Sequence, residues 1–317
     1  RKAGAVYLAR SVEELKILSD RYRNHPTQET EQEEKEAVSA GPLQKIWRVL
    51  YPIGIHYGIS FVVVQVAAIL LFSWYNMQQS GLNAEDVTGL IQQQAVLLTG
   101  IANALALIPL AILYQRDWRM RKNHLLGKKE NNQVLKKKGI YAATILFAIT
   151  ASHVLNDLIY YSGLDKIFPG YTQLEETAFQ KQNIFVMFIV IGVVSPIVEE
   201  VVFRGLVAKR IQDYLGTAWA VALSAVIFGA YHGNVMQFVY AGLLGLAFGL
   251  IMCRTNSLRV VITAHVAANI WSLVGSVLEE FLRQFSEGAF YAMLGCFVVM
   301  ALLSGVYIMT GKSREGK

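Results

Sequence analysis

Eight long apolar runs limit what this chain can fold into. A helix of about 20 apolar residues spans the hydrocarbon core of a bilayer, since each residue adds about 1.5 Å along its axis. Hydrophobic residues make up 54% of the 317 positions and charged residues only 16%, which is too apolar for an ordinary soluble domain. We therefore expect an all-α, polytopic membrane protein with eight transmembrane helices, over Pro52–Tyr75, Ala95–Tyr114, Gly139–Tyr161, Asn183–Phe203, the short run Ala218–His232, Met236–Cys253, Leu258–Val277 and Gly288–Thr310.

Lysine and arginine in the connections predict the orientation of these helices. The connection 115–138 carries nine of them, whereas the connection 76–94 carries none. Positively charged connections stay on the cytoplasmic side, so 115–138 is predicted to lie inside. With eight spans, both termini are then cytoplasmic. We expect an integral protein of a prokaryotic plasma membrane, and the formal net charge of +6 needs no nucleic-acid partner to explain it.

Hydropathy and charge divide the chain into four segments. Residues 1–50 mix acids and bases and are expected to form a cytoplasmic, partly disordered tail. Residues 51–182 hold the first three spans, 183–277 the next four, and 278–317 the last span with a basic tail. The chain begins at Arg1 and its first 50 residues lack an apolar stretch long enough for a signal peptide, so we expect a trimmed N-terminus.

The fourth run ends in two carboxylates and an arginine, Glu199-Glu200-Val201-Val202-Phe203-Arg204. Ionisable residues at membrane depth are costly and mark a functional site. Residues four apart share a helix face, so Glu200 pairs with Arg204, while the corresponding neighbour of Glu199 is the uncharged Phe203. We interpret Glu200 as structural and Glu199 as chemical. The alternative is that both acids bind Arg204 near the membrane surface.

Two later runs supply further polar residues. His232 ends the fifth run. Glu199 lies 17 positions before Gly216, and His232 lies 16 positions after it. If Gly216 is the apex of an antiparallel helix pair, the two side chains reach the same height. His265 and Asn269 in the seventh run are four apart and share a face. We expect the four side chains to converge in one polar intramembrane cavity, with Glu199 and His232 in direct or water-mediated contact.

Two other patterns have structural interpretations. The third run contains His153, Asn156 and Asp157. These residues could extend the polar site or simply satisfy one another near the outer surface. The sixth run carries small residues at four-residue spacing, Ala241, Gly245 and Gly249, which predict close helix packing.

Three motifs on successive apolar runs resemble those of the CAAX-protease and bacteriocin-processing family of intramembrane proteases, which includes the type II prenyl-protein endopeptidases. They are Glu199-Glu200-x-x-x-Arg204, Phe228-x-x-x-His232 and His265-x-x-x-Asn269. The resemblance covers Asn183 to about Val277 and implies that residues 183–277 form a catalytic core. It implies an eight-helix endopeptidase whose cavity opens to the cytoplasmic leaflet. Its partners would be the lipid bilayer and a substrate that is a membrane-associated, lipidated, signalling or bacteriocin-type peptide, or a prenylated protein.

The resemblance also implies roles for individual residues. Glu199 and His232 would activate a water, while His265 and Asn269 would polarise the scissile carbonyl and stabilise the oxyanion. Amide hydrolysis needs a base for the water and a proton donor for the leaving amine, and Glu and His can share that task. A supporting role falls to Glu200, Arg204 and Phe228.

Metal dependence is open in this family, whose members have been described both as metalloproteases and as metal-independent glutamate proteases. We expect no cofactor, because Asn269 is a poor zinc ligand and a good oxyanion donor. The alternative is a catalytic zinc ion with an open coordination position. Its candidate ligands are His232, His265 and Glu200.

A function of another class is compatible with the same residues. A non-catalytic membrane protein, such as an immunity or transport-associated protein, could retain a polar cavity. Loss of function in a Glu199→Gln protein that accumulates normally would favour the enzyme. Unchanged function would favour the non-catalytic protein.

Overall fold

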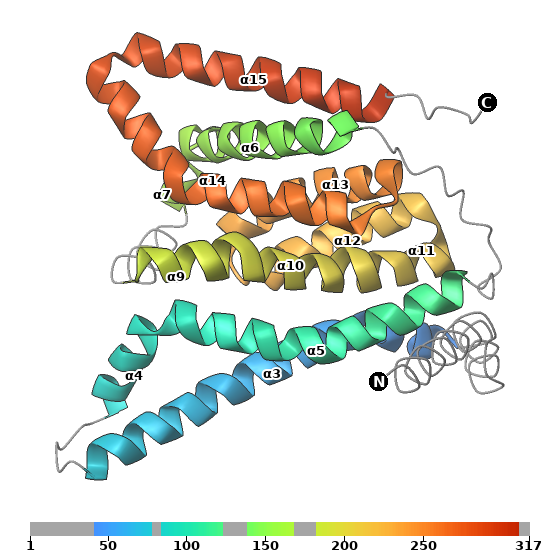
Figure 1. The fold of residues 1–317 in the computed structure, drawn as a ribbon, viewed down its shortest axis with the longest axis vertical. Helices are drawn as coiled ribbons and strands as arrows, with labels where there is room; N and C mark the ends of the chain where they lie inside the picture. Colours follow the sequence, from blue (N-terminus) through green and yellow to red (C-terminus); the bar gives the residue numbers. More distant parts are fainter. Residues whose placement is uncertain (1–40, 78–83, 123–137, 168–181, 311–317) are drawn as a thin grey trace, which may run out of the picture.

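The computed structural model describes residues 41–77, 84–122, 138–167 and 182–310, and every regular element in these ranges is a helix. The elements, labelled as in Figure 1, are α3 (Pro42–Met77), α4 (Ala84–Gln93), α5 (Ala95–Lys122), α6 (Lys138–Tyr161), α7 (Leu164–Ile167), α9 (Ile184–Ile189), η1 (Val190–Val194), α10 (Ser195–Glu200), η2 (Val201–Ala208), α11 (Lys209–Leu215), α12 (Thr217–Tyr231), α13 (Val235–Thr255), α14 (Leu258–Phe285) and α15 (Glu287–Thr310).

The described helices confirm the fold class. Seven of them are long and apolar enough to cross a membrane, counting α9 to α11 as one continuous rod, Ile184–Leu215. The fifth predicted span, Ala218–His232, corresponds to α12, which is apolar but has only 15 residues. The chain is therefore a polytopic, all-α membrane protein. The predicted count of eight holds only if the short α12 is included.

Several helices extend beyond the apolar runs that predicted them. α3 begins at Pro42 rather than Pro52, so the end of the predicted tail 1–50 is helical. The rod continues past Phe203 to Leu215. Hydropathy marks only the lipid-facing part of a helix, whereas its backbone hydrogen bonds continue until a capping or breaking residue. The predicted disorder of the tail falls on residues 1–40, which lie outside the described part, as do 123–137 of the basic connection and the C-terminal residues 311–317.

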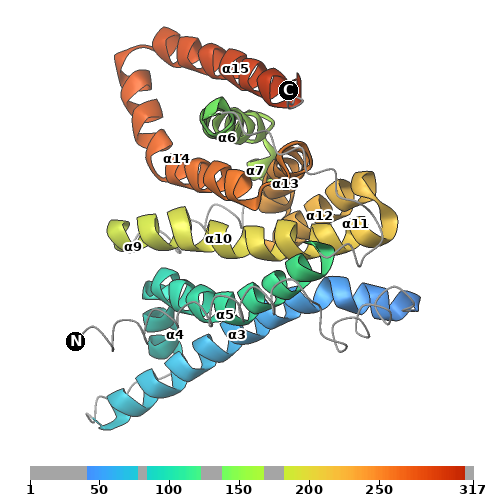
Figure 2. The same cartoon turned by 45° about the vertical axis from the view of Figure 1, so that its right-hand side comes forward.

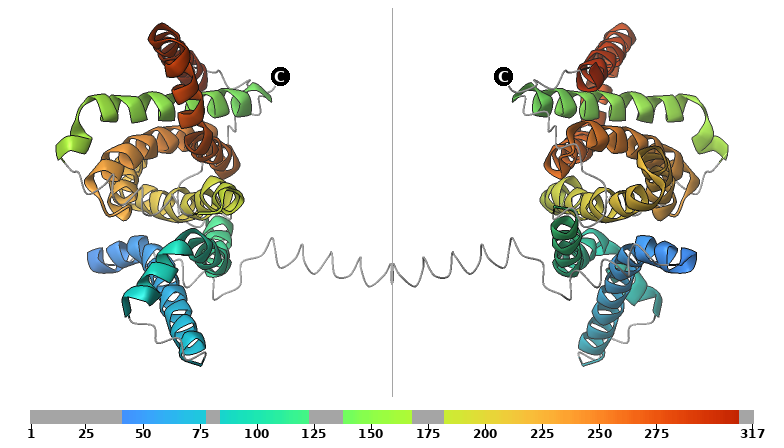
Figure 3. Two further views of the ribbon diagram at one scale, coloured as in Figure 1. Left: turned by 90° about the vertical axis from the view of Figure 1, so that its left-hand side faces the viewer. Right: turned by 90° about the vertical axis from the view of Figure 1, so that its right-hand side faces the viewer.

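The helices are arranged around the rod. α3 and α5 lie on one side of it, and α14 lies on the other, with α6 packed between α14 and α15 (Figures 1 and 2). α12 and α13 pair with each other beside the rod. Figure 3 shows the same order from two further directions. The rod and α14, which carry the predicted polar residues, are thus central in the bundle.

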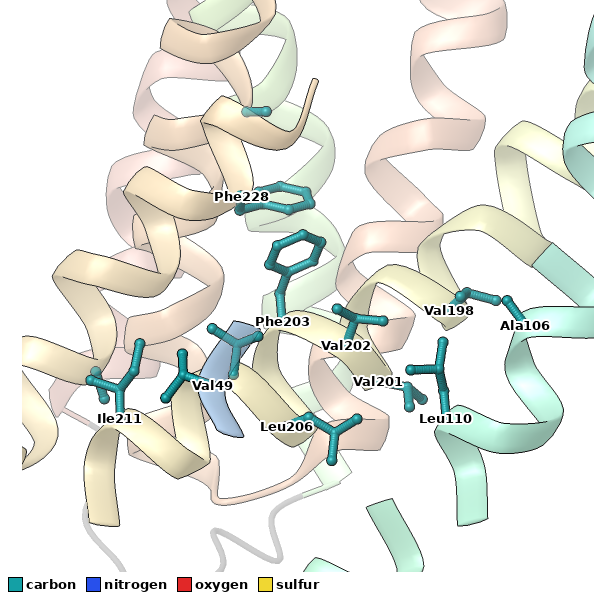
Figure 4. Close-up of a cluster of buried hydrophobic side chains, with 13 residues drawn as sticks. Val49, Ala106, Leu110, Val198, Val201, Val202, Phe203, Leu206, Ile211 and Phe228 are labelled. Carbon is teal, nitrogen blue, oxygen red and sulfur yellow. The ribbon is translucent and has the colours of Figure 1, made fainter. Parts of the chain in front are cut away.

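A buried apolar cluster fixes the rod against α5 and α12. Leu110 of α5 contributes to this cluster together with Val198 and Phe203 of the rod (Figure 4). The ring of Phe203 meets that of Phe228 edge-on, with centroids 4.9 Å apart (Figure 4). Gly216 lies between α11 and α12 with φ 86°, a left-handed conformation that favours glycine. Since the two phenylalanines are nearly equidistant from it in sequence, Gly216 is the apex of the antiparallel pair, as predicted.

Candidate functional site

The rod departs from regular α geometry on both sides of the two carboxylates. The π-helical segments η1 and η2 flank α10, which contains Ser195 to Glu200. Pro196 stands at the start of α10 and has no backbone N–H to continue the hydrogen-bond ladder. π-helical turns are rare and often occur at functional sites. Glu199 and Glu200 therefore belong to a short α-helical segment whose orientation is set by two irregular neighbours.

Glu200 accepts two hydrogen bonds at one oxygen. Its Oε1 lies 2.8 Å from Arg204 Nη1 and 2.7 Å from His265 Nδ1, and its side chain is fully buried. The predicted ion pair between Glu200 and Arg204 is confirmed. Because an ionised carboxylate can only accept, the Nδ1 of His265 carries the proton. Glu200 thus holds the histidine of α14 as well as the arginine of its own helix.

Arg204 is enclosed by two phenylalanines. Its guanidinium carbon lies 4.5 Å from the ring centroid of Phe228 and 5.5 Å from that of Phe248, and its Nη2 donates to the carbonyl of Gly245 at 3.2 Å. A Cβ on Gly245 would lie 3.0 Å from Phe228 Cδ1 and 3.4 Å from Arg204 Nη2. The small-residue stripe therefore lets α13 approach the buried arginine closely. Phe228 supports the site by covering one face of this cation.

His265 lies between the two carboxylates. Its Nε2 is 3.6 Å from Glu199 Oε2, slightly longer than a direct hydrogen bond. The side chain of Glu199 is 18% exposed, whereas that of Glu200 is not exposed at all. Nε2 of His265 therefore faces Glu199, the one of the two acids whose side chain is partly exposed. Glu199 makes no hydrogen bond to Arg204 among the described residues, which argues against the alternative that both acids bind the arginine.

His232 caps the end of α12. Its Nδ1 donates to the carbonyl of Phe228 at 2.9 Å, so a neutral His232 has its lone pair on Nε2. Its ring lies edge-on against Phe228, as does the ring of His265, with centroid distances of 4.9 and 5.9 Å. Within the described ranges, His232 and Glu199 share no direct hydrogen bond. The expectation was a direct or water-mediated contact, so the water-mediated form stays a prediction, while the histidine that the structure places beside Glu199 is His265.

Asn269 ties α14 to the first π-helical segment. Its Nδ2 donates to the carbonyl of Ile191 in η1 at 2.9 Å. An amide nitrogen carries two N–H groups, so one remains for another acceptor. His265 and Asn269 are four apart on α14, and both bond to the rod, as their shared helix face predicts.

A chain of hydrogen bonds that the sequence did not reveal runs beside Glu199. His56 Nε2 donates to Asn103 Oδ1 at 2.6 Å, and Asn103 Nδ2 donates to Ser195 Oγ at 2.8 Å. The hydroxyl of Tyr231 bonds to the remaining nitrogen of His56. Ser195 and Glu199 are four apart in α10 and share a face. The chain therefore ends one helical turn from Glu199.

The same chain begins next to His232. Tyr231 precedes His232 at the end of α12, and its backbone carbonyl accepts a hydrogen bond of 2.7 Å from the hydroxyl of Tyr57. α3 and α5 were predicted only to span the membrane. They also connect the helix of Glu199 to that of His232. The available signal was a histidine in the first apolar run and an asparagine in the second, because polar groups at membrane depth need partners.

The three candidate zinc ligands do not all lie within ligand distance of one another. The structure brings together one set of three His, Cys, Asp or Glu side chains with ligand atoms within 4.8 Å, counting only the described residues. That set is not His232, His265 and Glu200 but His153, Asp157 and Glu279. In addition, Glu200 Oε1 is occupied by Arg204 and His265, although its Oε2 is buried without a hydrogen-bond partner. The residues as placed do not fit a catalytic zinc ion, and no step below uses one.

Comparisons with known proteins match the segment that carries these residues. A family model described as "Type II CAAX prenyl endopeptidase Rce1-like" matches residues 181–271. Among curated proteins, the Bacillus subtilis (strain 168) protein called "Putative membrane peptidase YdiL" is 29% identical over 93 residues. The match covers 29% of this chain and 38% of that relative, so the chain spans well under half of its length. No solved structure matches the chain significantly. Over the segment 181–271, the chain is therefore similar to the type II CAAX prenyl endopeptidase family and to the protein called "Putative membrane peptidase YdiL".

Proposed function

We propose that this protein is an intramembrane endopeptidase that hydrolyses a peptide bond with a water activated by Glu199. The observation that carries the proposal is the position of His265, which bonds to Glu200 through Nδ1 and faces Glu199 through Nε2. An acid, a histidine and a second acid that orients it form a recurrent arrangement for general acid–base chemistry. The arrangement lies in the segment that resembles the endopeptidase family.

Burial and pairing assign different tasks to the two acids. Glu200 is fully buried and bonded to Arg204 and His265, so it supports the site without meeting a substrate. Glu199 is the more exposed acid, and Arg204 bonds to Glu200 rather than to it. A carboxylate needs a free oxygen to accept a proton from water. Glu199 is therefore the general base of the proposal.

The reaction can be written with the side chains present. The water oxygen attacks the carbonyl carbon while Glu199, aided by the unprotonated Nε2 of His232, takes a water proton. A protonated His265, stabilised by Glu200, donates from Nε2 to the resulting oxyanion. The second N–H of Asn269 donates to the same oxygen. The carbon–nitrogen bond then breaks as the proton that Glu199 took from the water passes to the leaving amine.

The proposed substrate is a membrane-associated peptide or a prenylated protein. Lipidated, signalling and bacteriocin-type peptides all have a part that partitions into the bilayer, which would bring a scissile bond to helices of this depth. The matching family is one of prenyl endopeptidases, and prenylated proteins are one such class. We propose a prokaryotic plasma membrane as the location, with both termini in the cytoplasm, from the basic connection 115–138.

The peptides that this protein produces test the proposal. Membranes that contain the wild type, Glu199→Gln or Glu287→Gln are compared for peptide products by mass spectrometry at equal levels of folded protein. Glu287 is an exposed acid at the start of α15 and serves as the matched control. Products that appear with the wild type and Glu287→Gln and vanish with Glu199→Gln support the endopeptidase. The same products in all three membranes would instead favour the immunity or transport-associated protein.

A further inference from the structure

The polar residues of the third apolar run meet an acid from α14. His153 and Asp157 of α6 lie beside Glu279, and one ligand atom from each is within 4.8 Å of the others. The distance from His153 Nε2 to Asp157 Oδ2 is 3.8 Å. Asn156, the third polar residue of that run, is exposed and is not part of the cluster. The cluster lies about 20 Å beyond His265 along α14, at about 1.5 Å per residue, and is separate from the proposed active site.

Two atoms of this cluster are buried without a hydrogen-bond partner. They are His153 Nε2 and Asp157 Oδ2, in side chains that are only 5% and 6% exposed. Buried polar atoms in proteins are almost always bonded, and an unsatisfied one is destabilising. These two atoms face each other across a gap too long for a hydrogen bond. A single ligand between them would satisfy both.

Aromatic rings hold the histidine in position. The imidazole of His153 packs edge-on against Trp271, with centroids 5.9 Å apart, and against Phe297, with centroids 5.1 Å apart. A rigid ring in apolar surroundings presents its Nε2 in a fixed direction. Glu279 completes the cluster from the more exposed side and also accepts hydrogen bonds from Arg283 at 2.8 and 2.9 Å, both through Oε1. Its second oxygen remains for another partner.

We propose that His153, Asp157 and Glu279 bind a divalent transition-metal cation that fastens α6 to α14. An imidazole with two carboxylates suits Zn²⁺ or Mn²⁺, whereas Mg²⁺ and Ca²⁺ prefer oxygen ligands alone. Zn²⁺ takes nitrogen and oxygen ligands at about 2.0–2.2 Å in tetrahedral geometry, which separates two of its ligand atoms by about 3.4 Å. The 3.8 Å gap between His153 and Asp157 is close to that separation, and a small rotation of the Asp157 carboxylate closes the difference. The half-buried Glu279 can close onto the ion by rotation of its side chain.

Zinc binding by the purified full chain tests this site. The protein in lipid nanodiscs is stripped with EDTA, titrated with ZnCl₂, desalted and assayed for bound zinc and melting temperature. We expect about one zinc per chain and a higher melting temperature, because a ligand that binds only the folded state stabilises it. Parallel titrations with MnCl₂ and MgCl₂ report the cation class, and Mg²⁺ is expected to have no effect.

Variants locate the bound ion. Glu279→Gln, at the partly exposed edge, is expected to weaken zinc binding at least tenfold while the protein stays folded, and Asp157→Asn to do the same. The matched controls are Glu280→Gln and Asn156→Ala, exposed neighbours on the same two helices, which are expected to bind zinc like the wild type. Absence of zinc binding by the wild type, or equal binding by Glu279→Gln, would overturn the proposal. Loss of zinc binding in Glu199→Gln but not in Glu279→Gln would move the ion to the proposed active site.

Discussion

His265 donates its Nδ1 proton to Glu200 at 2.7 Å and points its Nε2 toward Glu199. The second acid of the Glu-Glu pair therefore sets the tautomer of a histidine that lies 65 positions away in sequence. This contact joins two of the three sequence motifs into one unit. It also means that a change at Glu200 acts on the histidine as well as on Arg204.

Glu199→Gln is expected to lower the cleavage rate at least about 100-fold, the usual lower end for loss of a general base. Glutamine has nearly the same shape as glutamate but cannot accept the water proton. Because Glu199 makes no buried ion pair with Arg204, the melting temperature should change little. Cleavage per mole of folded protein and thermal unfolding, measured on the same preparation, check both statements. Normal cleavage by Glu199→Gln would show that another group is the base.

Glu200→Gln is expected to lower the stability of the folded protein and not only its cleavage rate. It leaves Arg204, which is 1% exposed, without its counter-charge, and breaking a buried pair commonly costs about 3–5 kcal/mol. Replacing Arg204 by Met as well should recover part of the melting temperature, since no buried charge then remains. A stable but inactive Glu200→Gln protein, together with normal cleavage by Glu199→Gln, would mean that the roles of the two acids are reversed.

Local spacing predicted contacts within one helix or one helix pair. The pairing of Glu200 with Arg204 and the shared face of His265 and Asn269 follow from residues four apart. The apex at Gly216 follows from glycine at a turn between apolar runs. The fold class followed from hydropathy, because a bilayer admits few alternatives to the helix.

Contacts between separate helices could not be predicted in this way. Whether Glu199 meets His232 or His265 depends on how far α12 and α14 are rotated about their axes, which the spacing leaves free. The π-helical segments on both sides of α10 change that rotation further. His56 and Asn103 are 47 positions apart on different helices, so their hydrogen bond appears only when α3 packs on α5.

Asn103→Leu tests the hydrogen-bond chain that joins α3 and α5 to α10. It leaves His56 Nε2 and Ser195 Oγ without partners in a buried position, which costs about 1–3 kcal/mol per group. We expect a lower melting temperature and slower cleavage, because the helix turn that carries Glu199 is less firmly held. Asn156→Leu, an exposed asparagine on α6, is the control and should leave both unchanged.

The same chain predicts non-additive effects. His56→Phe and Asn103→Leu each break the hydrogen bond between His56 and Asn103. Once one substitution has removed this bond, the other cannot remove its stabilisation again. The double variant should therefore be less destabilised than the sum of the two single variants, as expected of residues in one network. Additive losses within about 0.5 kcal/mol would mean that His56 and Asn103 act independently.

Two glycines at the contact of α12 with α13 are predicted to respond differently to alanine. A Cβ on Gly229 would lie 2.6 Å from the carbonyl oxygen of Phe238, a backbone atom that cannot move alone. Gly229→Ala should therefore destabilise the protein by about 1–3 kcal/mol, as overpacking usually does. A Cβ on Gly242 would meet its nearest atom at 3.8 Å, so Gly242→Ala should be tolerated or slightly stabilising. Thermal unfolding of both variants in the same lipid checks the difference, and equal melting temperatures would contradict the packing described for this helix pair.

Removal of metal is expected to separate stability from catalysis. If a cation binds His153, Asp157 and Glu279, stripping it with EDTA should lower the melting temperature, because the ion then no longer fastens α6 to α14. Cleavage per mole of folded protein, measured well below that temperature, should stay within about twofold, a margin of about 0.4 kcal/mol, because the proposed reaction uses only side chains. Glu279→Gln serves as the control, since its melting temperature should no longer respond to EDTA. Complete loss of cleavage with EDTA, restored by zinc in wild type and Glu279→Gln alike, would instead favour a zinc ion near His232 and His265, with Glu200 displaced from Arg204 to bind it.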